Sequence, residues 1–275
     1  MQNRSHSIRG HDAISYVEQH GTELEKARLH YILYGTRPSS DVVYSLHRVQ
    51  NSDGGFPLGM LQDNPSTVDS TLTALWQMDE LGMLESLSVS QAVSFLLVSQ
   101  KDDGGWDEDP DITKYDLPPW INPGDLKTRI YLTAYSAYWL ACRGYQSQTA
   151  FKRALVFLRK HQNEAGKIFG YAHSTWIAVS VFLMAGDPYS DIARKCLQYL
   201  LNKPLSSWVD SQLAWALDCL GKAGIPKEHP FIQGALAELL RRQSAEGSWL
   251  SEDGEKHTAV ATLEVLKVMK CYGEV

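Results

Sequence analysis

Four titratable side chains stand at the start of four predicted apolar helices. They open the segments Asp69-Ser-Thr-Leu, His173-Ser-Thr-Trp, Asp210-Ser-Gln-Leu and His257-Thr-Ala-Val. If these helices pack side by side, residues at one register meet at one end of the assembly. Two carboxylates and two imidazoles can hold a divalent cation such as Zn, Mn, Fe or Mg, and one buried carboxylic acid can act as a general acid. We therefore predict a catalytic set, or alternatively a metal-binding set, composed of Asp69, His173, Asp210 and His257.

The two Asp residues also fit a structural role. Asp is preferred at helix N-caps, where its carboxylate accepts backbone N–H groups and the helix dipole favours negative charge. The same dipole disfavours a protonated His, so His173 and His257 point more firmly to function. Helix capping by Asp69 and Asp210 is therefore kept as the alternative.

Aromatic residues follow on the same predicted helices, and positions four and seven residues along share a face with each helix start. The residues predicted to line a cavity there, or to close over it, are Trp76, Tyr131, Tyr135, Tyr138 and Trp120. Aromatic faces bind apolar ligands and stabilise a cation by about 0.5–2 kcal/mol each. The alternative is that these rings pack in the protein core.

A long loop is predicted over residues 107–126, which carry six acidic residues and four prolines. Asp107, Glu108, Asp109 and Asp111 could bind a cation, but Pro110 prevents the helix that would space them. The composition favours a solvated lid in which Trp120 closes over a ligand.

One turn pattern repeats along the chain. It reads Gln50-Asn-Ser-Asp53-Gly54-Gly55-Phe56 and Gln100-Lys-Asp-Asp103-Gly104-Gly105-Trp106, with partial copies at Gln162-Asn-Glu-Ala-Gly166 and Gln243-Ser-Ala-Glu246-Gly247-Ser248-Trp249. A repeat of this length is typical of a helix pair in a solenoid or closed array. The paired glycines supply the positive φ that ends the first helix, and the aromatic ring covers the turn.

Six helix pairs are predicted around these turns. The more charged first members lie near 11–20, 39–50, 88–100, 148–162, 188–202 and 228–243, and the more apolar second members near 22–35, 66–82, 128–144, 173–186, 208–222 and 256–272. An apolar set and a charged set of helices favour two concentric rings. The predicted fold is an all-α (α/α)6 barrel, or toroid, forming a single domain over residues 1–275.

Composition excludes several classes of protein. Lys plus Arg is 26 and Asp plus Glu is 32, so the net charge of −6 argues against a nucleic-acid partner. No apolar run approaches the roughly 20 residues of a membrane span. The opening MQNRSHSIRGHD has no apolar core, so a signal peptide is not expected and a cytoplasmic location is predicted.

The Gln-x-x-Asp-Gly-Gly-Phe/Trp turns resemble the "QW" repeats of squalene–hopene cyclases and the related turns of protein prenyltransferase β subunits. The resemblance covers nearly the whole chain and implies an α/α barrel, here in a single-barrel member. It also implies an aromatic-lined cavity for an isoprenoid (prenyl) substrate. Those cyclases start the reaction with an Asp-x-Asp-Asp motif, and in Thr67-Val68-Asp69-Ser70 only the middle Asp matches.

The prenyltransferase comparison concerns other positions. Asp210 and His257 match the Asp and His of the zinc site in those enzymes, while Gln212 occupies the position of the zinc-binding Cys. His173 resembles the histidine that contacts the diphosphate. Arg129, with Lys127 beside it, lies where a diphosphate-contacting arginine is expected, so both join the predicted substrate-binding residues.

The leading prediction is a terpene cyclase-like or prenyltransferase-like enzyme of isoprenoid biosynthesis, an isomerase or lyase that cyclises or rearranges a prenyl substrate. One alternative is a metal-dependent enzyme that uses the Asp/His/Asp/His cluster. A second is a non-catalytic barrel that binds a hydrophobic ligand, and a third is a β-like subunit that needs a partner.

Overall fold

The computed structural model describes residues 9–186 and 189–275, and this part of the chain is almost entirely helical. The first members of the helix pairs are α1 (Gly10–His20), α3 (Ser40–Val49), α5 (Leu87–Ser99), α7 (Thr149–Lys160), α9 (Ser190–Leu201) and α11 (Pro230–Arg242). The second members are α2 (Glu23–Tyr34), α4 (Val68–Glu80), α6 (Leu126–Cys142), α8 (Ala172–Ala185), α10 (Asp210–Lys222) and α12 (Thr258–Cys271). The predicted all-α class with six helix pairs is therefore confirmed.

Sheet structure in the described residues is limited to one short hairpin. Strand β1 (Phe56–Pro57) pairs antiparallel with β2 (Ser66–Thr67), with Phe56 opposite Thr67. Short 3-10 helices occur at Leu58–Met60, Pro110–Lys114, Leu205–Ser207 and Glu255–His257. None of the helices in the described ranges is long and apolar enough to cross a membrane.

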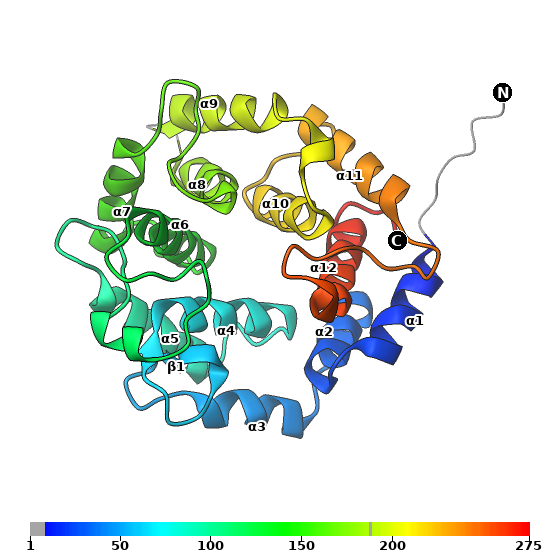
Figure 1. Cartoon of the computed structure of the whole chain (residues 1–275), viewed down its shortest axis with the longest axis horizontal. Helices are drawn as coiled ribbons and strands as arrows, with labels where there is room; N and C mark the ends of the chain where they lie inside the picture. The colour runs from blue at the N-terminus through cyan, green and yellow to red at the C-terminus, as the bar shows by residue number, and fades with distance from the viewer. Residues whose placement is uncertain (1–8, 187–188) are drawn as a thin grey trace. The chain divides into compact units, whose positions relative to one another are not determined.

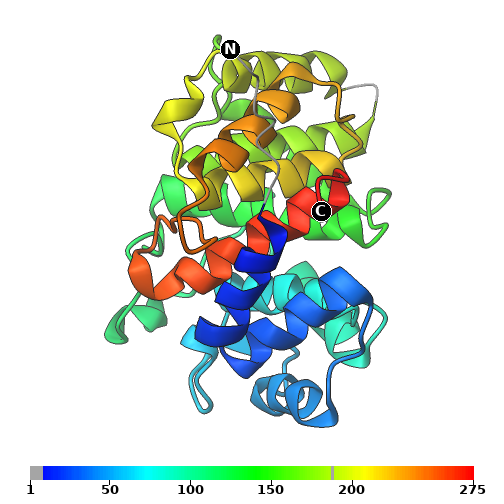
Figure 2. The ribbon, with the colours of Figure 1, turned by 90° about the vertical axis from the view of Figure 1, so that its right-hand side faces the viewer.

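The described residues form two compact units. The central unit spans Ser40–Tyr199, and the terminal unit combines Met1–Ser39 with Leu200–Val275. In the central unit, α4, α6 and α8 form one row, and α3, α5 and α7 form a second row that covers it (Figure 1). In the terminal unit, α1 lies beside α12 (Figure 2). A single barrel domain over 1–275 stays a prediction.

First and second members differ in how much of their surface is buried, as α7 and α6 illustrate. Helix α6, a second member, is buried almost all round from Ile130 to Ala141, as expected of a helix that is apolar on every face. Helix α7, a first member, buries only one face, and its basic residues lie on the other. In the central unit, the second members α4, α6 and α8 therefore supply most of the interior.

The repeated turn owes its conformation to its Gln and Gly residues. The Gln100 side chain donates to the carbonyl oxygen of Gly104 (2.9 Å) in its own turn and to that of Ala150 (2.8 Å) in the next first-member helix. Gly104 has φ +91°, and a Cβ atom there would lie 2.7 Å from the carbonyl oxygen of Arg153. Only glycine permits this close approach of two backbones.

The aromatic residue of each turn is structural. Phe56, Trp106 and Trp249 are all buried. The Trp106 backbone N–H donates to Thr133 Oγ1 (2.9 Å), and its indole N–H donates to the Leu96 carbonyl (2.7 Å). These bonds fix the start of α6 against the preceding turn, and the other turns make the equivalent backbone bond to Thr71, Thr175 and Thr262.

Candidate functional site

Asp69 lies in the first turn of α4, in the central unit. The helix cap is Thr67, whose side chain accepts the Ser70 N–H (3.2 Å), so the Asp69 carboxyl is not used for capping. Burial raises the pKa of Asp69 to about 6, and hydrogen bonds from the side chains of Trp120 and Tyr131 act in the opposite direction. The Asp69 carboxyl group therefore stays protonated in mildly acidic solution. When it ionises, Trp120 and Tyr131 stabilise the carboxylate by donating hydrogen bonds to it.

Trp120 reaches Asp69 because its loop is fastened at several points. The Trp120 carbonyl accepts hydrogen bonds from Thr128 Oγ1 (2.9 Å) and from the Tyr171 hydroxyl (3.2 Å). The Asp107 carboxylate accepts the Gly124 N–H (3.1 Å) at the far end of the loop. Trp120, which is half-buried, is thus fixed as a donor to Asp69.

Tyr131, which donates to this carboxyl group, belongs to a chain of aromatic side chains on α6 and α8. Tyr131, Tyr135 and Tyr138 follow one another along α6 with ring centroids 6.1 Å apart at each step. The His173 ring of α8 meets Tyr131 edge-on at 6.4 Å and Trp176 at 4.9 Å. The structure therefore brings three predicted site residues, Asp69, Tyr131 and His173, into one cluster with Trp120.

Trp76 lies further along α4 than the cluster. Its indole N–H donates to Glu80 Oε1 (2.8 Å) one turn later, and Glu80 is buried. Trp76 is half-buried, so the predicted cavity-lining role stays a prediction.

Glu108 is a second buried carboxyl group that sequence reasoning assigned to the solvated lid. Only 3% of the residue is exposed, and its two carboxylate oxygens accept the backbone N–H groups of Val68 and Asp69, each at 2.8 Å. Burial raises the pKa of Glu108 to about 7. A solvated position for Glu108 was therefore wrong. Glu108 lies two residues after Trp106, and the other turns carry Leu58, Gly170 and Ser251 at that position. A carboxyl group that occurs in only one of four repeats is the sequence signal that could have marked Glu108 as special.

Arg129 and Lys127 lie at the start of α6. The Arg129 guanidinium pairs with Asp103 (2.6 Å) and Asp107 (3.5 Å) and lies over the Phe157 ring, 5.4 Å from its centroid. Lys127 is exposed. The Arg129 charge is thus compensated inside the protein, whereas Lys127 faces solvent.

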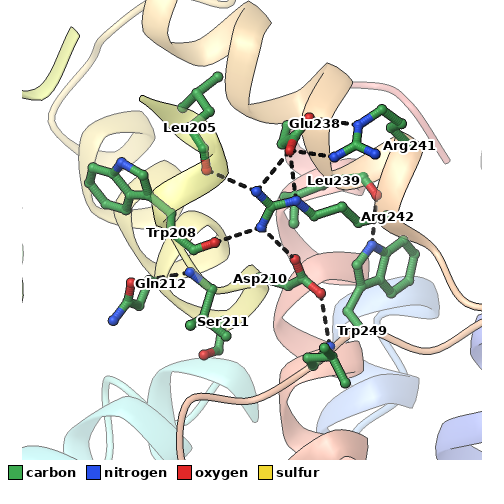
Figure 3. A network of polar contacts seen from close by, with 12 residues as sticks. Leu205, Trp208, Asp210, Ser211, Gln212, Glu238, Leu239, Arg241, Arg242 and Trp249 are labelled. Carbon is green, nitrogen blue, oxygen red and sulfur yellow. Dashed lines mark hydrogen bonds and ion pairs between the residues drawn. The ribbon is translucent and has the colours of Figure 1, made fainter. Parts of the chain in front are cut away.

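Asp210 in the terminal unit occupies the register of Asp69 but has different partners (Figure 3). Its Oδ1 accepts Arg242 Nη1 (3.1 Å), and its Oδ2 accepts the Leu250 N–H (2.9 Å). Arg242 also donates to Glu238 and to the Trp208 carbonyl (2.6 Å). The Asp210 carboxylate is therefore part of a charged structural network.

His257 ends a 3-10 helix directly before α12 and is half-buried. It belongs to the terminal unit with Asp210, whereas Asp69 and His173 belong to the central unit. Convergence of all four residues stays a prediction. Across residues 9–186 and 189–275, no three His, Cys, Asp or Glu side chains are grouped as a metal site requires.

Two curated proteins are similar to this chain in sequence. The squalene–hopene cyclase of Zymomonas mobilis is 25% identical over 236 residues, covering 71% of this chain and 36% of the cyclase. The lanosterol synthase erg7A of Aspergillus fumigatus is 22% identical over 267 residues, covering 79% of this chain and 35% of the synthase. This chain therefore spans about a third of the length of these curated relatives. No protein-family model matches it.

Solved structures share the fold. The type II terpene cyclase MstE from Scytonema superposes with a TM-score of 0.65 at 16% identity, over 97% of this chain and 98% of MstE. The ent-copalyl diphosphate synthase from Streptomyces platensis superposes with a TM-score of 0.59 at 13% identity, over 91% of this chain and 50% of the synthase. A variant of MstE has also been solved in complex with the substrate geranylgeranyl dihydroxybenzoate.

The helix pairs of this chain, joined by Gln-Gly-aromatic turns, superpose on the helical fold of the type II terpene cyclases. Its sequence is similar to those of a squalene–hopene cyclase and a lanosterol synthase.

Proposed function

We propose that this protein is a proton-initiated isoprenoid cyclase in which Asp69 is the general acid. The observation that carries the proposal is the Asp69 carboxyl group, whose pKa burial raises to about 6 while Trp120 and Tyr131 donate to it. A general acid works best when its pKa lies near the working pH, so that it is protonated, and when its conjugate base is stabilised as the proton leaves. Asp69 meets both requirements without flanking carboxylates.

The reaction begins with transfer of the Asp69 proton to one carbon of a substrate double bond. The π electron pair forms the new C–H bond, and the neighbouring carbon becomes a carbocation. Asp69 becomes a carboxylate that accepts from the Trp120 indole and the Tyr131 hydroxyl. Further double bonds attack the cation to close rings, and loss of a proton ends the sequence. The Tyr135 and Tyr138 faces can stabilise the moving charge by about 0.5–2 kcal/mol each.

The surroundings of the acid favour an isoprenoid without a diphosphate group. Arg129, the side chain expected to contact a diphosphate, is paired with Asp103 and Asp107. Diphosphate binding would have to break these pairs and would bring a polyanion beside Glu108 and Asp69. MstE, which shares the fold, binds geranylgeranyl dihydroxybenzoate, a prenyl chain on an aromatic acid. We therefore propose a prenylated substrate of this kind, or an isoprenoid hydrocarbon, for this protein.

Turnover in D2O tests the proposal directly. Purified protein is incubated with geranylgeranyl dihydroxybenzoate, squalene and geranylgeranyl diphosphate in separate reactions. A proton-initiated cyclase places one solvent deuterium in each cyclised product molecule, which mass spectrometry detects. Asp69→Asn should form cyclised product about 1,000-fold more slowly than wild type. Cyclised product without deuterium, or unchanged turnover by Asp69→Asn, would overturn the assignment of Asp69.

The metal-dependent alternative is tested by the same assay. Under our proposal EDTA leaves turnover and melting temperature unchanged. Loss of both after EDTA treatment would favour a cation held by Asp69, His173, Asp210 and His257. The cytoplasmic location and the absence of a nucleic-acid partner remain predictions from composition.

A further inference from the structure

Glu108 links the start of α4 to the loop that follows the next aromatic turn. Building on the proposed function, we propose that Glu108 is a positioning residue that holds the first turn of α4 and thereby leaves the Asp69 carboxyl group available for proton transfer. The link consists of two hydrogen bonds of 2.8 Å from the Val68 and Asp69 N–H groups to the two oxygens of one buried carboxylate. Asp69 is therefore fixed at its own backbone nitrogen.

The terminal unit makes the equivalent link with the chemical roles exchanged. There the helix supplies the carboxylate and the loop supplies the N–H group, because Asp210 Oδ2 accepts the Leu250 N–H at 2.9 Å. Leu250 follows Trp249 by one residue, as Glu108 follows Trp106 by two. Each helix start is thus linked to the loop after the next turn. In α10 the Asp210 side chain itself forms the link, whereas in α4 the link uses Glu108 and leaves the Asp69 side chain out.

The link also places a second titratable carboxyl group beside Asp69. Burial raises the pKa of Glu108 to about 7, and its bonds to the Asp69 and Val68 N–H groups act in the opposite direction. The charged groups that face it are Asp69 of α4 and Asp107 of its own loop, and Arg129 of α6 pairs with Asp107. Tyr131 and His173 are the other titratable groups of the Asp69 cluster. The Asp69 anion disfavours ionisation of Glu108, so Asp69 ionises first as pH rises.

The experiment follows the ionisation of Asp69 without needing a substrate. Protein labelled with 13C at the Asp side-chain carboxyl carbon is titrated by NMR, and the signal of Asp69 is identified by its loss in Asp69→Asn. In wild-type protein the signal should titrate near pH 6. In Glu108→Gln the midpoint should move to lower pH, because losing one backbone bond loosens the first turn of α4 and lets water reach the Asp69 carboxyl group, whose burial raises its pKa. Asp111→Asn, an exposed acid on the same loop, is the matched control and should leave the midpoint in place.

Turnover of geranylgeranyl dihydroxybenzoate provides the second readout. Glu108→Gln should lower kcat by about 10- to 100-fold with KM within about twofold, because misplacing a catalytic group affects the reaction step rather than binding. Its activity should also be lost at lower pH than that of wild type. Glu108→Asp keeps the carboxyl group but has a shorter reach, so it should also lower kcat and move the Asp69 midpoint to lower pH.

The possible failures are distinguishable. If Asp69→Asn is inactive but Glu108→Gln titrates and turns over like wild type, Glu108 is not a positioning residue and the proposed function stands. If Asp69→Asn remains active, the proposed function is wrong, while the NMR midpoint in Glu108→Gln still reports on the link. If Glu108→Gln does not fold, as judged by circular dichroism, Glu108→Asp carries the test. A Glu108→Asp protein with wild-type kcat would overturn the inference.

Discussion

The first turns of α4 and α10 contain the same pair, Asp followed by Ser, yet the two carboxyl groups have different environments. Asp69 receives hydrogen bonds from two neutral donors, an indole and a phenol. Asp210 meets the Arg242 guanidinium at 3.1 Å and a backbone N–H group. A short motif at a helix start therefore does not define a role. The partner that reaches the carboxyl group from elsewhere in the fold decides whether it is an acid or a structural anchor.

The largest expected difference between the two sites is in catalysis. Asp69→Asn should lower turnover by about 1,000-fold, the usual range for loss of a general acid or base, while the circular dichroism spectrum stays unchanged. Asp210→Asn should keep turnover within about tenfold of wild type once the protein is folded. Equal losses in both variants would mean that Asp210 also takes part in the chemistry.

Stability should show the opposite ranking. Arg242→Met leaves the buried Asp210 carboxylate without its cation and removes the donors to Leu205 and Trp208. Breaking a buried pair in this way costs about 3–5 kcal/mol, measurable by urea unfolding. In a double-mutant cycle, Asp210→Asn combined with Arg242→Met should cost less than the sum of the single variants. Simple additivity would contradict a direct pair.

The effect of pH on the melting temperature should distinguish Asp69 from Asp210. Its pKa is about 6 in the folded protein and 3.8 in the unfolded chain, so the folded state binds the extra proton and loses stability as pH rises through about 6. Asp69→Asn removes this loss and should melt about 5 °C higher than wild type at pH 8. At pH 4 the difference should disappear. Asp210→Asn should bring no gain at pH 8.

Lowering the pH should produce a smaller effect in the Asp210 network. Hydrogen bonds from Arg241 and Arg242 lower the pKa of Glu238 from 4.5 to about 2. The stability that Glu238 contributes is present above about pH 4.5 and is lost as pH falls toward 2. Glu238→Gln should therefore melt about 2 °C lower than wild type at pH 6, because its partner Arg241 is largely exposed and solvent screens that ion pair. At pH 2 the two proteins should melt alike.

The fold was accessible from sequence because its signals are local. Helical periodicity and the Gln-Gly-aromatic turns predicted the helix pairs, and α1, for example, was expected over 11–20 and observed over Gly10–His20. These signals act over a few residues, within one turn or one helix. Tertiary packing did not need to be known to read them.

The site was only partly accessible, because its key contacts join distant residues. Asp69 was predicted as a candidate acid, but its donors lie 51 and 62 positions later, at Trp120 and Tyr131. Glu108 was placed in solvent because an acid-rich, proline-rich loop usually is solvated. Its burial depends on the α4 N-terminus, 40 residues earlier. Asp210 and Arg242 are 32 residues apart in the chain, so local sequence patterns could not predict their pairing either.

The link between Gln243 and Arg9 has a consequence for the order of folding during synthesis. Gln243 donates to the Arg9 carbonyl across 234 residues, and Lys270 donates to the Leu33 carbonyl across 237. All segments of the central unit are contiguous in the chain, so this unit can fold while the ribosome is still translating. The first two helices must wait for α11 and α12, which takes on the order of 10–50 s at usual elongation rates. During that interval α1 and α2 have each other but lack α12, the helix against which both pack, so they stay accessible to chaperones and proteases.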